Sequence, residues 1–479
     1  MSIKGRVWVI AVVAVILLGY PLAAWVIGIS VEKQIEAREQ QTLQAVPYLT
    51  VVNRTYRRGV YAATEEVTYG LSSTFAKALQ AAPADALLRD ARITIRNTIH
   101  HGPLPGMRTF ALATIDSEPV LPAQWRKQLD KPLGGKPILS SHAALSWGGS
   151  THYEVVSPAF EMELSPGTTV AWQGLSGSGD ATRNQETSHA DILFKGLQFR
   201  GDKGSGEIGQ IHATTDLHRV FTTLMAGKVG ATIDKIEIHP IGQQPAASLQ
   251  QLRLEADSAA TGDYLDSKFD ISIGRMSAGG FEATQLGYAG ALDHEYGPAI
   301  AALTEKIRAV SQHNAQSAAG LQANPQEILD ILQHEGVELL VHDLVLTISR
   351  IGFVTPEGEM RIAAKFTTSG LTRDDFSRAG PAMMAAVIPH IQATADLAID
   401  VPLLAKLTAG NPRGEQLQTQ LQTLQKQGYV LSNDKTLTAH MAFTGGRLTV
   451  NDMPFPPPPS ARAPAEGAAP PPTRRRKHG

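Results

Sequence analysis

The feature that most constrains this chain is an uncharged stretch of 25 residues near its beginning, Val7–Val31. Lys4 and Arg6 precede the stretch, and Glu32 and Lys33 follow it. A helix needs about 20 apolar residues to cross the hydrocarbon core of a bilayer. The apolar region of a cleaved signal peptide usually runs only about 7 to 15 residues. The stretch therefore predicts a transmembrane anchor that is retained in the mature protein.

The charges around this segment predict its orientation. Basic residues alone precede it, whereas acidic and basic residues alternate after it. Because cytoplasmic flanks carry an excess of Lys and Arg, we expect residues 1–6 to be cytoplasmic. Everything after the anchor would then lie outside the inner membrane, which in a bacterium is the periplasm.

Composition limits what the remaining 450 or so residues can be. A part of this length exceeds one typical core, so we expect two or three domains or one elongated β-structure. With 43 basic and 45 acidic residues, the chain has no global field that would attract nucleic acid. It contains no cysteine, which excludes disulfides and thiol chemistry.

Residues 32–44 are charged and Gln-rich and predict a juxtamembrane helix or stalk. From residue 45 to 290 strand signals dominate. Ile93, Ile95 and Ile99 alternate with polar residues, which is typical of antiparallel strands with one covered and one wet face. Gly- and Ser-rich turns recur at short intervals, so we predict a long antiparallel meander. The one helix expected within it is Asp216–Ala226, whose apolar residues fall at helical spacing.

Residues 291–455 predict an α+β portion. Helices are expected at 300–310, from Pro325 onward, at 374–396 with interruptions at Pro381 and Pro389, and at Glu415–Gln427. Strands are expected around 338–350 and 359–367, and a hairpin at 437–450 ends the portion. Residues 456–479 hold prolines and a basic block and predict a disordered tail. The fold class is therefore mainly β with an α+β C-terminal part, behind one transmembrane helix.

Three local signatures resemble the YdgA-like family of bacterial inner-membrane-anchored proteins, whose biochemical function is unassigned. They are the segments Tyr56–Tyr61, His101–Pro105 and Gly446–Asn451, in that order after one N-terminal helix. The resemblance covers residues 1 to about 455 and leaves the tail outside the family pattern. It implies a single-pass protein with a large β-rich periplasmic portion that can self-associate. It brings no catalytic residues.

Two of these signatures supply the candidate binding residues, which are Tyr56, Arg58, Gly59, Tyr61, His101, Gly102 and Pro103. Tyrosine and arginine suit lipid headgroups, but the segment lies some twenty residues beyond the anchor and reaches the bilayer only if the chain folds back. Proline and glycine after His101 must end a strand, which favours a structural histidine at a sheet corner.

The sequence indicates no catalytic, cofactor or metal site. Gly204–Gly209 matches the dinucleotide fingerprint by letter, but strand-like residues follow it where the motif needs a helix. The fifteen histidines are dispersed, and no Walker loop or His-Glu-x-x-His motif occurs. We therefore expect no cofactor and no bound metal.

From these observations we expect a non-enzymatic envelope protein that binds or organises an envelope component on an amphipathic sheet. In the more specific form of this hypothesis, the component is lipid. One alternative is a self-associating scaffold, because Leu417, Leu421 and Leu424 form a narrow stripe. Another is a hydrolase that uses His101. The expected partners are the inner membrane and, through the basic residues of the tail, acidic envelope surfaces; these residues are Arg474, Arg475, Arg476 and Lys477.

Overall fold

The structure is a computed structural model that describes residues 3–46, 49–72, 92–107, 109–165, 167–202, 204–222, 224–242, 245–316, 325–409 and 412–455. In the first helix, side chains before Gly19 lie outside this description, and so do the tail and its basic block. Within the described part, twenty-four strands form one antiparallel sheet.

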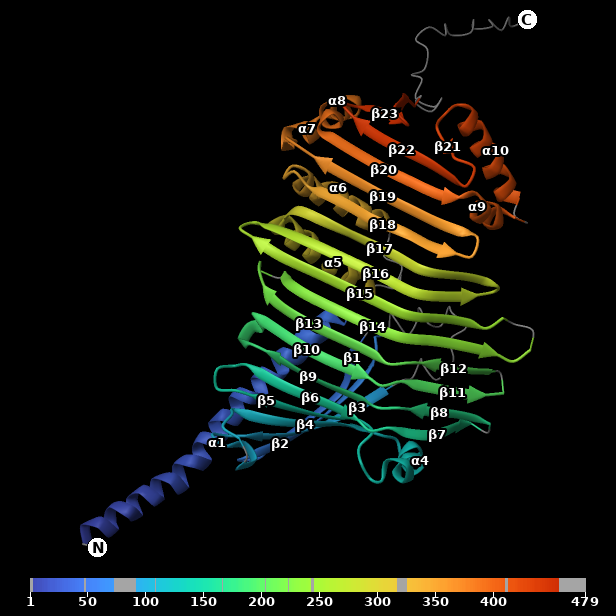
Figure 1. Ribbon diagram of the computed structural model, residues 1–479. Helices are drawn as coiled ribbons and strands as arrows, with labels where there is room; N and C mark the ends of the chain where they lie inside the picture. The colour runs from blue at the N-terminus through green and yellow to red at the C-terminus, as the bar shows by residue number, and fades with distance from the viewer. Residues whose placement is uncertain are drawn as a thin grey trace, which may run out of the picture.

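The chain begins with a long helix, α1 (Ile3–Ala45), which projects from one end of the sheet (Figure 1). The helix includes the expected stalk. The first strands each pair with the next one along the chain. They are β1 (Leu49–Arg58), β2 (Ala62–Leu71), β3 (Arg92–His101), β4 (Ala113–Val120) and β5 (Ser140–Leu145), with a 3-10 turn at Pro105–Met107 and helix α4 (Ala123–Leu133) between them.

The middle of the sheet is built from long strands that are each interrupted once. Two backbone hydrogen bonds of 2.9 Å, from Gln173 to Gly196 and from Lys195 to Gly174, carry the ladder across one of these breaks. The two halves of each strand are separated by only a few residues, so each pair of halves forms one long strand with a local irregularity of the bulge type. The halves are β6 (Thr151–Ser157) and β7 (Phe160–Ser165), β8 (Thr168–Trp172) and β9 (Leu175–Ala181), β10 (Thr187–Phe194) and β11 (Leu197–Gly201), and β12 (Gly204–Ile208) and β13 (Ile211–Arg219).

Longer hairpins complete the sheet. They begin with β14 (Met225–Pro240), β15 (Ala247–Thr261), β16 (Tyr264–Ala278) and β17 (Phe281–Tyr296). Helices α5 (Gly297–Gln316) and α6 (Pro325–Leu340) follow and lie behind the sheet in the view of Figure 1. Strand β18 (Val345–Thr355) then pairs with β17, so the β-rich and α+β portions share one sheet.

The C-terminal end alternates strands with short helices. Its strands are β19 (Gly358–Thr368), β20 (Ile391–Asp400), β21 (Leu431–Ser432), β22 (Thr436–Thr444), β23 (Arg447–Val450) and β24 (Met453–Pro454). Its helices are α7 (Arg373–Ser377), α8 (Pro381–Val387), α9 (Val401–Thr408) and α10 (Pro412–Lys426).

The predicted fold class is confirmed in its main point, because the protein is a large antiparallel sheet with a minority of helices. The helices expected at 300–310, from Pro325 and at Glu415–Gln427 are α5, α6 and α10, and the terminal hairpin is β22–β23. Among the residues with described side chains, no helix has the length and hydropathy that a membrane crossing requires.

One predicted helix is wrong, and a second is correct only as far as His390. Asp216–Ala226 contains the end of β13, a turn closed by the Val220 amide and the Leu224 carbonyl, and the start of β14. The region 374–396 is helical only in its first part, because β20 begins at Ile391. In both places cross-strand pairing outweighs a local apolar spacing that fits a helix.

Candidate functional site

The segment Tyr56–Tyr61 does fold back along α1. The Arg58 guanidinium lies 2.8 Å from the Glu32 carboxylate and 5.7 Å from the ring centre of Trp25. Farther toward the start of the helix, the rings of Tyr20 and Tyr61 are 5.9 Å apart. Strand β1 and the turn after it therefore run back beside the C-terminal part of the expected anchor.

The His-Gly-Pro segment packs against the same stretch of helix. His101 is 1% exposed, and its Nδ1 lies 2.9 Å from the carbonyl oxygen of Ala24. A carbonyl oxygen can only accept, so Nδ1 carries the proton and donates it. A Cβ on Gly28 would lie 2.5 Å from the imidazole Cε1, and a Cβ on Gly102 would lie 3.1 Å from the Ala24 methyl. Small residues on α1 are thus what allow the ring to reach the helix backbone.

Burial lowers the pKa of His101 below its ordinary value, because the charged ring would lose its hydration. The histidine is therefore neutral at pH 7, held between helix and sheet. The enclosed ring offers a substrate no direct access, so its geometry favours positioning of α1 over the hydrolase alternative. Pro103, beside it, begins the loop that leaves the strand.

Ion pairs and hydrogen bonds fix the part of α1 after residue 31 to the sheet. Arg54 donates to Glu65 at 2.8 Å and lies 3.4 Å from Glu36 of the helix. Asn97 donates to the second Glu65 oxygen at 2.8 Å, so this carboxylate, 1% exposed, has partners on both oxygens. A buried carboxylate is tolerated only when it is paired in this way.

The remaining candidates complete this contact. Tyr56 packs against the buried cluster that α1 forms with the sheet, and burial raises the pKa of its hydroxyl to about 12. Gly59 makes the turn after β1, where its amide donates to the Ala62 carbonyl at 2.8 Å. The cluster itself contains Val31, Ala63, Ile99, Ala113 and Leu145. We call the contact of residues 20–39 with β1–β5 and their loops the α1 junction.

A second feature is a continuous apolar face, which the sequence predicted only in general terms as one side of an amphipathic sheet. In every strand pair from β2 to β23 an uncharged residue of this face lies opposite another one. One such row runs through Ala63, Ile99, Ile115, Ala143, Tyr153, Gly179, Ala190, Thr215, Val229, Ala256, Phe269, Gly290, Ile348, Ala364, Ala395, Met441 and Val450. Seventeen strands spaced at about 4.8 Å give this row a length of roughly 75 Å.

The opposite face is charged. Cross-strand pairs of histidine and aspartate recur on it, with nitrogen–oxygen distances of 2.7–3.0 Å. The pairs are His142–Asp116, His152–Asp180, His212–Asp191 and His440–Asp396. The sheet is therefore amphipathic across its width, and the alternation that predicted strands is also what separates the two faces.

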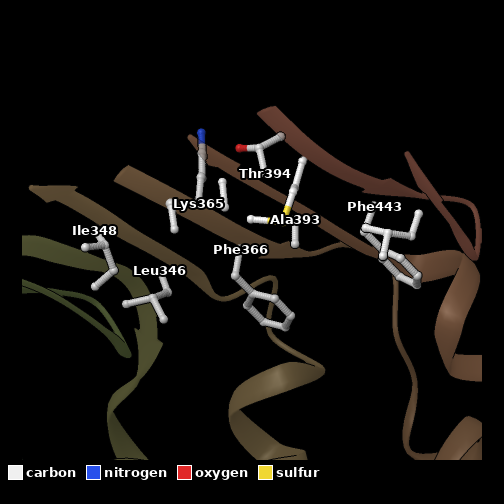
Figure 2. A pocket seen from close by; sticks show the side chains of 11 residues that line it. Leu346, Ile348, Lys365, Phe366, Ala393, Thr394 and Phe443 are labelled. Carbon is white, nitrogen blue, oxygen red and sulfur yellow. The ribbon is translucent and has the colours of Figure 1, made fainter. Parts of the chain in front are cut away.

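The apolar face is hollowed near the C-terminal end. A cavity of about 230 Å³ lies over β18–β22, and Figure 2 shows Leu346, Ile348, Phe366 and Phe443 pointing to one side of the strands while Lys365 points to the other. Ala364 also lines the cavity. Within the part of the chain that the structure describes, no group of three potential metal ligands occurs.

Comparison with known proteins places this architecture in a family. A family model described as a bacterial protein of unknown function, DUF945, matches residues 4–458. The chain belongs to this family. The match includes both the α1 junction and the apolar face, and it does not confirm the narrower YdgA-like name. No curated protein and no solved structure matches the chain.

Proposed function

We propose that this protein is anchored in the bacterial inner membrane by α1 and binds the acyl chains of lipids along the apolar face of its periplasmic sheet. The observation that carries the proposal is the row of uncharged residues that runs from the α1 junction to the terminal hairpin. An apolar face becomes part of a protein core only where a second layer of the protein covers it. Where no such layer covers it, the face is available to a ligand.

Burial along the face supports a ligand rather than a packed core. In β15 the inward residues Leu252, Leu254 and Ala256 are half-buried, and the residues between them are exposed. The two fully buried apolar clusters of the described residues lie at α1 and at α4, outside β14–β22. We call the apolar face over β14–β22 the distal face. Its side chains are apolar but only half-buried, as expected of a surface that accepts a partner.

The residue types along the row favour flexible chains over a rigid protein partner. Glycine and alanine recur between larger residues, as in Gly179, Ala190, Gly290 and Ala364, and the rings of Tyr153 and Phe269 occupy the space above Gly179 and Gly290. The absence of charge from the row means that acyl chains would meet no desolvation cost from the protein. Each methylene taken out of water is worth about 0.8 kcal/mol.

The anchor supplies the source of the lipid. Residues 7–31 are uncharged, and Val31 at the end of this stretch packs beside the row at Ala63 and Ile99. A lipid that leaves the bilayer along α1 would therefore meet the near end of the apolar face. The far end lies roughly 75 Å away across the strands.

The experiment uses two neighbouring alanines of β19 that face opposite sides. Ala364 lines the distal cavity, whereas Ala363 lies opposite Asp396 on the charged face. The full chain, purified in mild detergent, is tested by native mass spectrometry for co-purified phospholipid and by titration with a fluorescent fatty acid. We expect Ala364→Arg to weaken binding about tenfold or more, since a guanidinium cannot be desolvated cheaply there, and Ala363→Arg to leave binding unchanged.

Absence of lipid from the unmodified protein, together with no saturable fatty-acid binding, would remove the proposal. If Ala364→Arg and Ala363→Arg weaken lipid binding equally, the loss reflects damage to strand β19 and not the chemistry of the apolar face. Light scattering on the same samples addresses the scaffold alternative. A stable oligomer that Ala364→Arg dissociates would show that a second copy, and not lipid, covers the face.

A further inference from the structure

Three loops meet at the end of the sheet from which the lower half of α1 projects. The Tyr20 hydroxyl donates to the Leu104 carbonyl at 3.1 Å and lies 3.9 Å from the Met107 sulfur. Tyr61, in the turn between β1 and β2, contacts Tyr20 with its ring tilted against the tyrosine ring of the helix. The loop between β3 and β4 is therefore fixed beside the helix at residue 20, next to the β1–β2 turn.

The third loop joins this group through an aromatic pair. The rings of Phe110 and Trp147 are stacked at 5.7 Å, and the Leu112 amide donates to the Leu145 carbonyl at 2.8 Å. Trp147 lies in the β5–β6 turn. We name the three tips together the loop collar, whose apolar members are Val60, Tyr61, Leu104, Met107, Phe110 and Trp147.

The loop collar is unusual because its large apolar side chains are exposed. Met107 is 79% exposed and Phe110 is 74% exposed, and the other four are exposed as well. The three segments, 59–61, 102–112 and 146–150, contain no acidic residue. Exposed apolar groups gathered in this way indicate an interaction surface, and tyrosine and tryptophan among them are typical of a membrane–water interface.

We propose that the loop collar rests in the interfacial layer of the bilayer around α1, so that the sheet is seated directly on the membrane. This inference rests on the anchoring part of the proposed function and adds a second lipid contact. Its occupant is the bilayer surface because the collar encircles one side of the helix at Tyr20, directly after the uncharged residues 7–19. The uncharged helical residues 7–19 span about 20 Å at 1.5 Å each, and the long side chains of Lys4 and Arg6 before them can extend to the opposite headgroups of a core about 30 Å thick.

The same inference gives residues 20–31 a role different from that expected. Ala24 and Val31 are fully buried and Gly28 is buried, all against the sheet. One face of the C-terminal part of the apolar stretch therefore packs against the sheet, while Leu22, Trp25 and Val26 on the rest of its surface are exposed. In this proposal the membrane boundary lies near Tyr20. A rigid helix that is shared between bilayer and sheet would hold the apolar face at a fixed height over the lipid.

The test uses the absence of cysteine, which permits single labelled sites without background. Nitroxide labels are placed on Phe110→Cys and Val60→Cys in the collar, on Val13→Cys in the anchor, and on Ile241→Cys at the far end of β14. Ile241 is the matched control, because it is 67% exposed and apolar but distant from α1. The full-length variants are reconstituted in vesicles of phosphatidylethanolamine and phosphatidylglycerol.

Collision rates with oxygen, which partitions into lipid, and with a water-soluble nickel chelate then give the depth of each label. We expect residues 110 and 60 to report a depth at the headgroup level, between residue 13 in the hydrocarbon core and residue 241 in water. If residue 13 is in lipid while 110 and 60 match 241, the collar is wrong and the anchor stands. If residue 13 is itself in water, the anchoring fails and the collar fails with it.

Discussion

The α1 junction and the distal apolar face are made from the same alternating pattern, yet they have opposite characters. At the junction Ile99 is completely buried, because α1 covers it. In the distal half Ile271 occupies an equivalent inward position on β16 and is only half-buried. The comparison teaches that alternation fixes which side chains share a face, whereas the element that covers the face decides whether it becomes a core or a binding surface.

The largest effect is expected where the junction buries a charge. Arg54→Ala leaves Glu65 inside the protein without its cation, which should lower the free energy of unfolding by about 3–5 kcal/mol. Chemical denaturation of the full chain in detergent, followed by tryptophan fluorescence, measures the loss. In the distal half Arg253→Ala removes a solvent-exposed pair with Glu255 and should cost less than about 1 kcal/mol. Equal costs would contradict the difference between the two regions.

A direct comparison of the two faces comes from one substitution made twice. Ile99→Ala should cost about 2–5 kcal/mol, because it opens a cavity under α1. Ile271→Ala should cost less than about half of this amount, since the side chain is already partly hydrated. Thermal melts in mild detergent provide the measurement. If Ile271→Ala is as costly as Ile99→Ala, the distal face is a packed core, and the lipid proposal loses its main support.

The strands and helices of both regions show how much of the fold could be predicted from the sequence. Alternation around Ile95 and Ile99 predicted β3 correctly, and Pro325 correctly marked the start of α6. The last residues of the region 374–396, from Ile391, were misjudged because Ala393 and Ala395 give a weak apolar signal for a strand that pairs on both sides. Gly227, directly after the predicted helix Asp216–Ala226, has a φ of 134° and allows a close approach between β13 and β14, which a helix at this place does not require.

The candidate residues were found in the sequence, but their common purpose was not. His101 and Ala24 are separated by 77 positions, and no local pattern links them. The fit depends on the missing side chain of Gly28, which in sequence is one glycine among 43. The sequence predicted an amphipathic sheet but not the continuity of its apolar face, because that continuity depends on the register of every strand pair rather than on any one strand.

The glycine that admits His101 gives the next prediction. Gly28→Ala places a methyl group against an enclosed imidazole, so helix or ring must move, at a cost of about 1–3 kcal/mol. Gly19→Ala, on the same helix, meets nothing within 4 Å and should be neutral or slightly stabilising. Limited proteolysis of β1–β4 in the full chain reports release of the helix. Protection that is the same in both variants would show that the junction accommodates a methyl group at residue 28 and that the fit of His101 does not depend on this glycine.

The smallest effect separates the junction from the distal half by pH. His101 is neutral in the folded protein with a lowered pKa, whereas in the unfolded chain it takes up a proton near pH 6.5. Acidification from pH 7.5 to 5.5 should therefore stabilise the unfolded state and lower the free energy of unfolding. His101→Gln keeps a donor for the Ala24 carbonyl but does not titrate, so its disadvantage of about 1–2 kcal/mol at pH 7.5 should shrink as pH falls.

The matched control for this titration is His152→Gln, because His152 lies exposed on the charged face beside Asp180. The hydrogen bond to Asp180 raises the pKa of His152, which reverses the sign, since protonation then favours the folded state. Acidification should enlarge the difference between the parent protein and His152→Gln while it narrows the difference for His101→Gln. A gap for His101→Gln that stays constant with pH would mean that water reaches the imidazole and that α1 does not seal the junction.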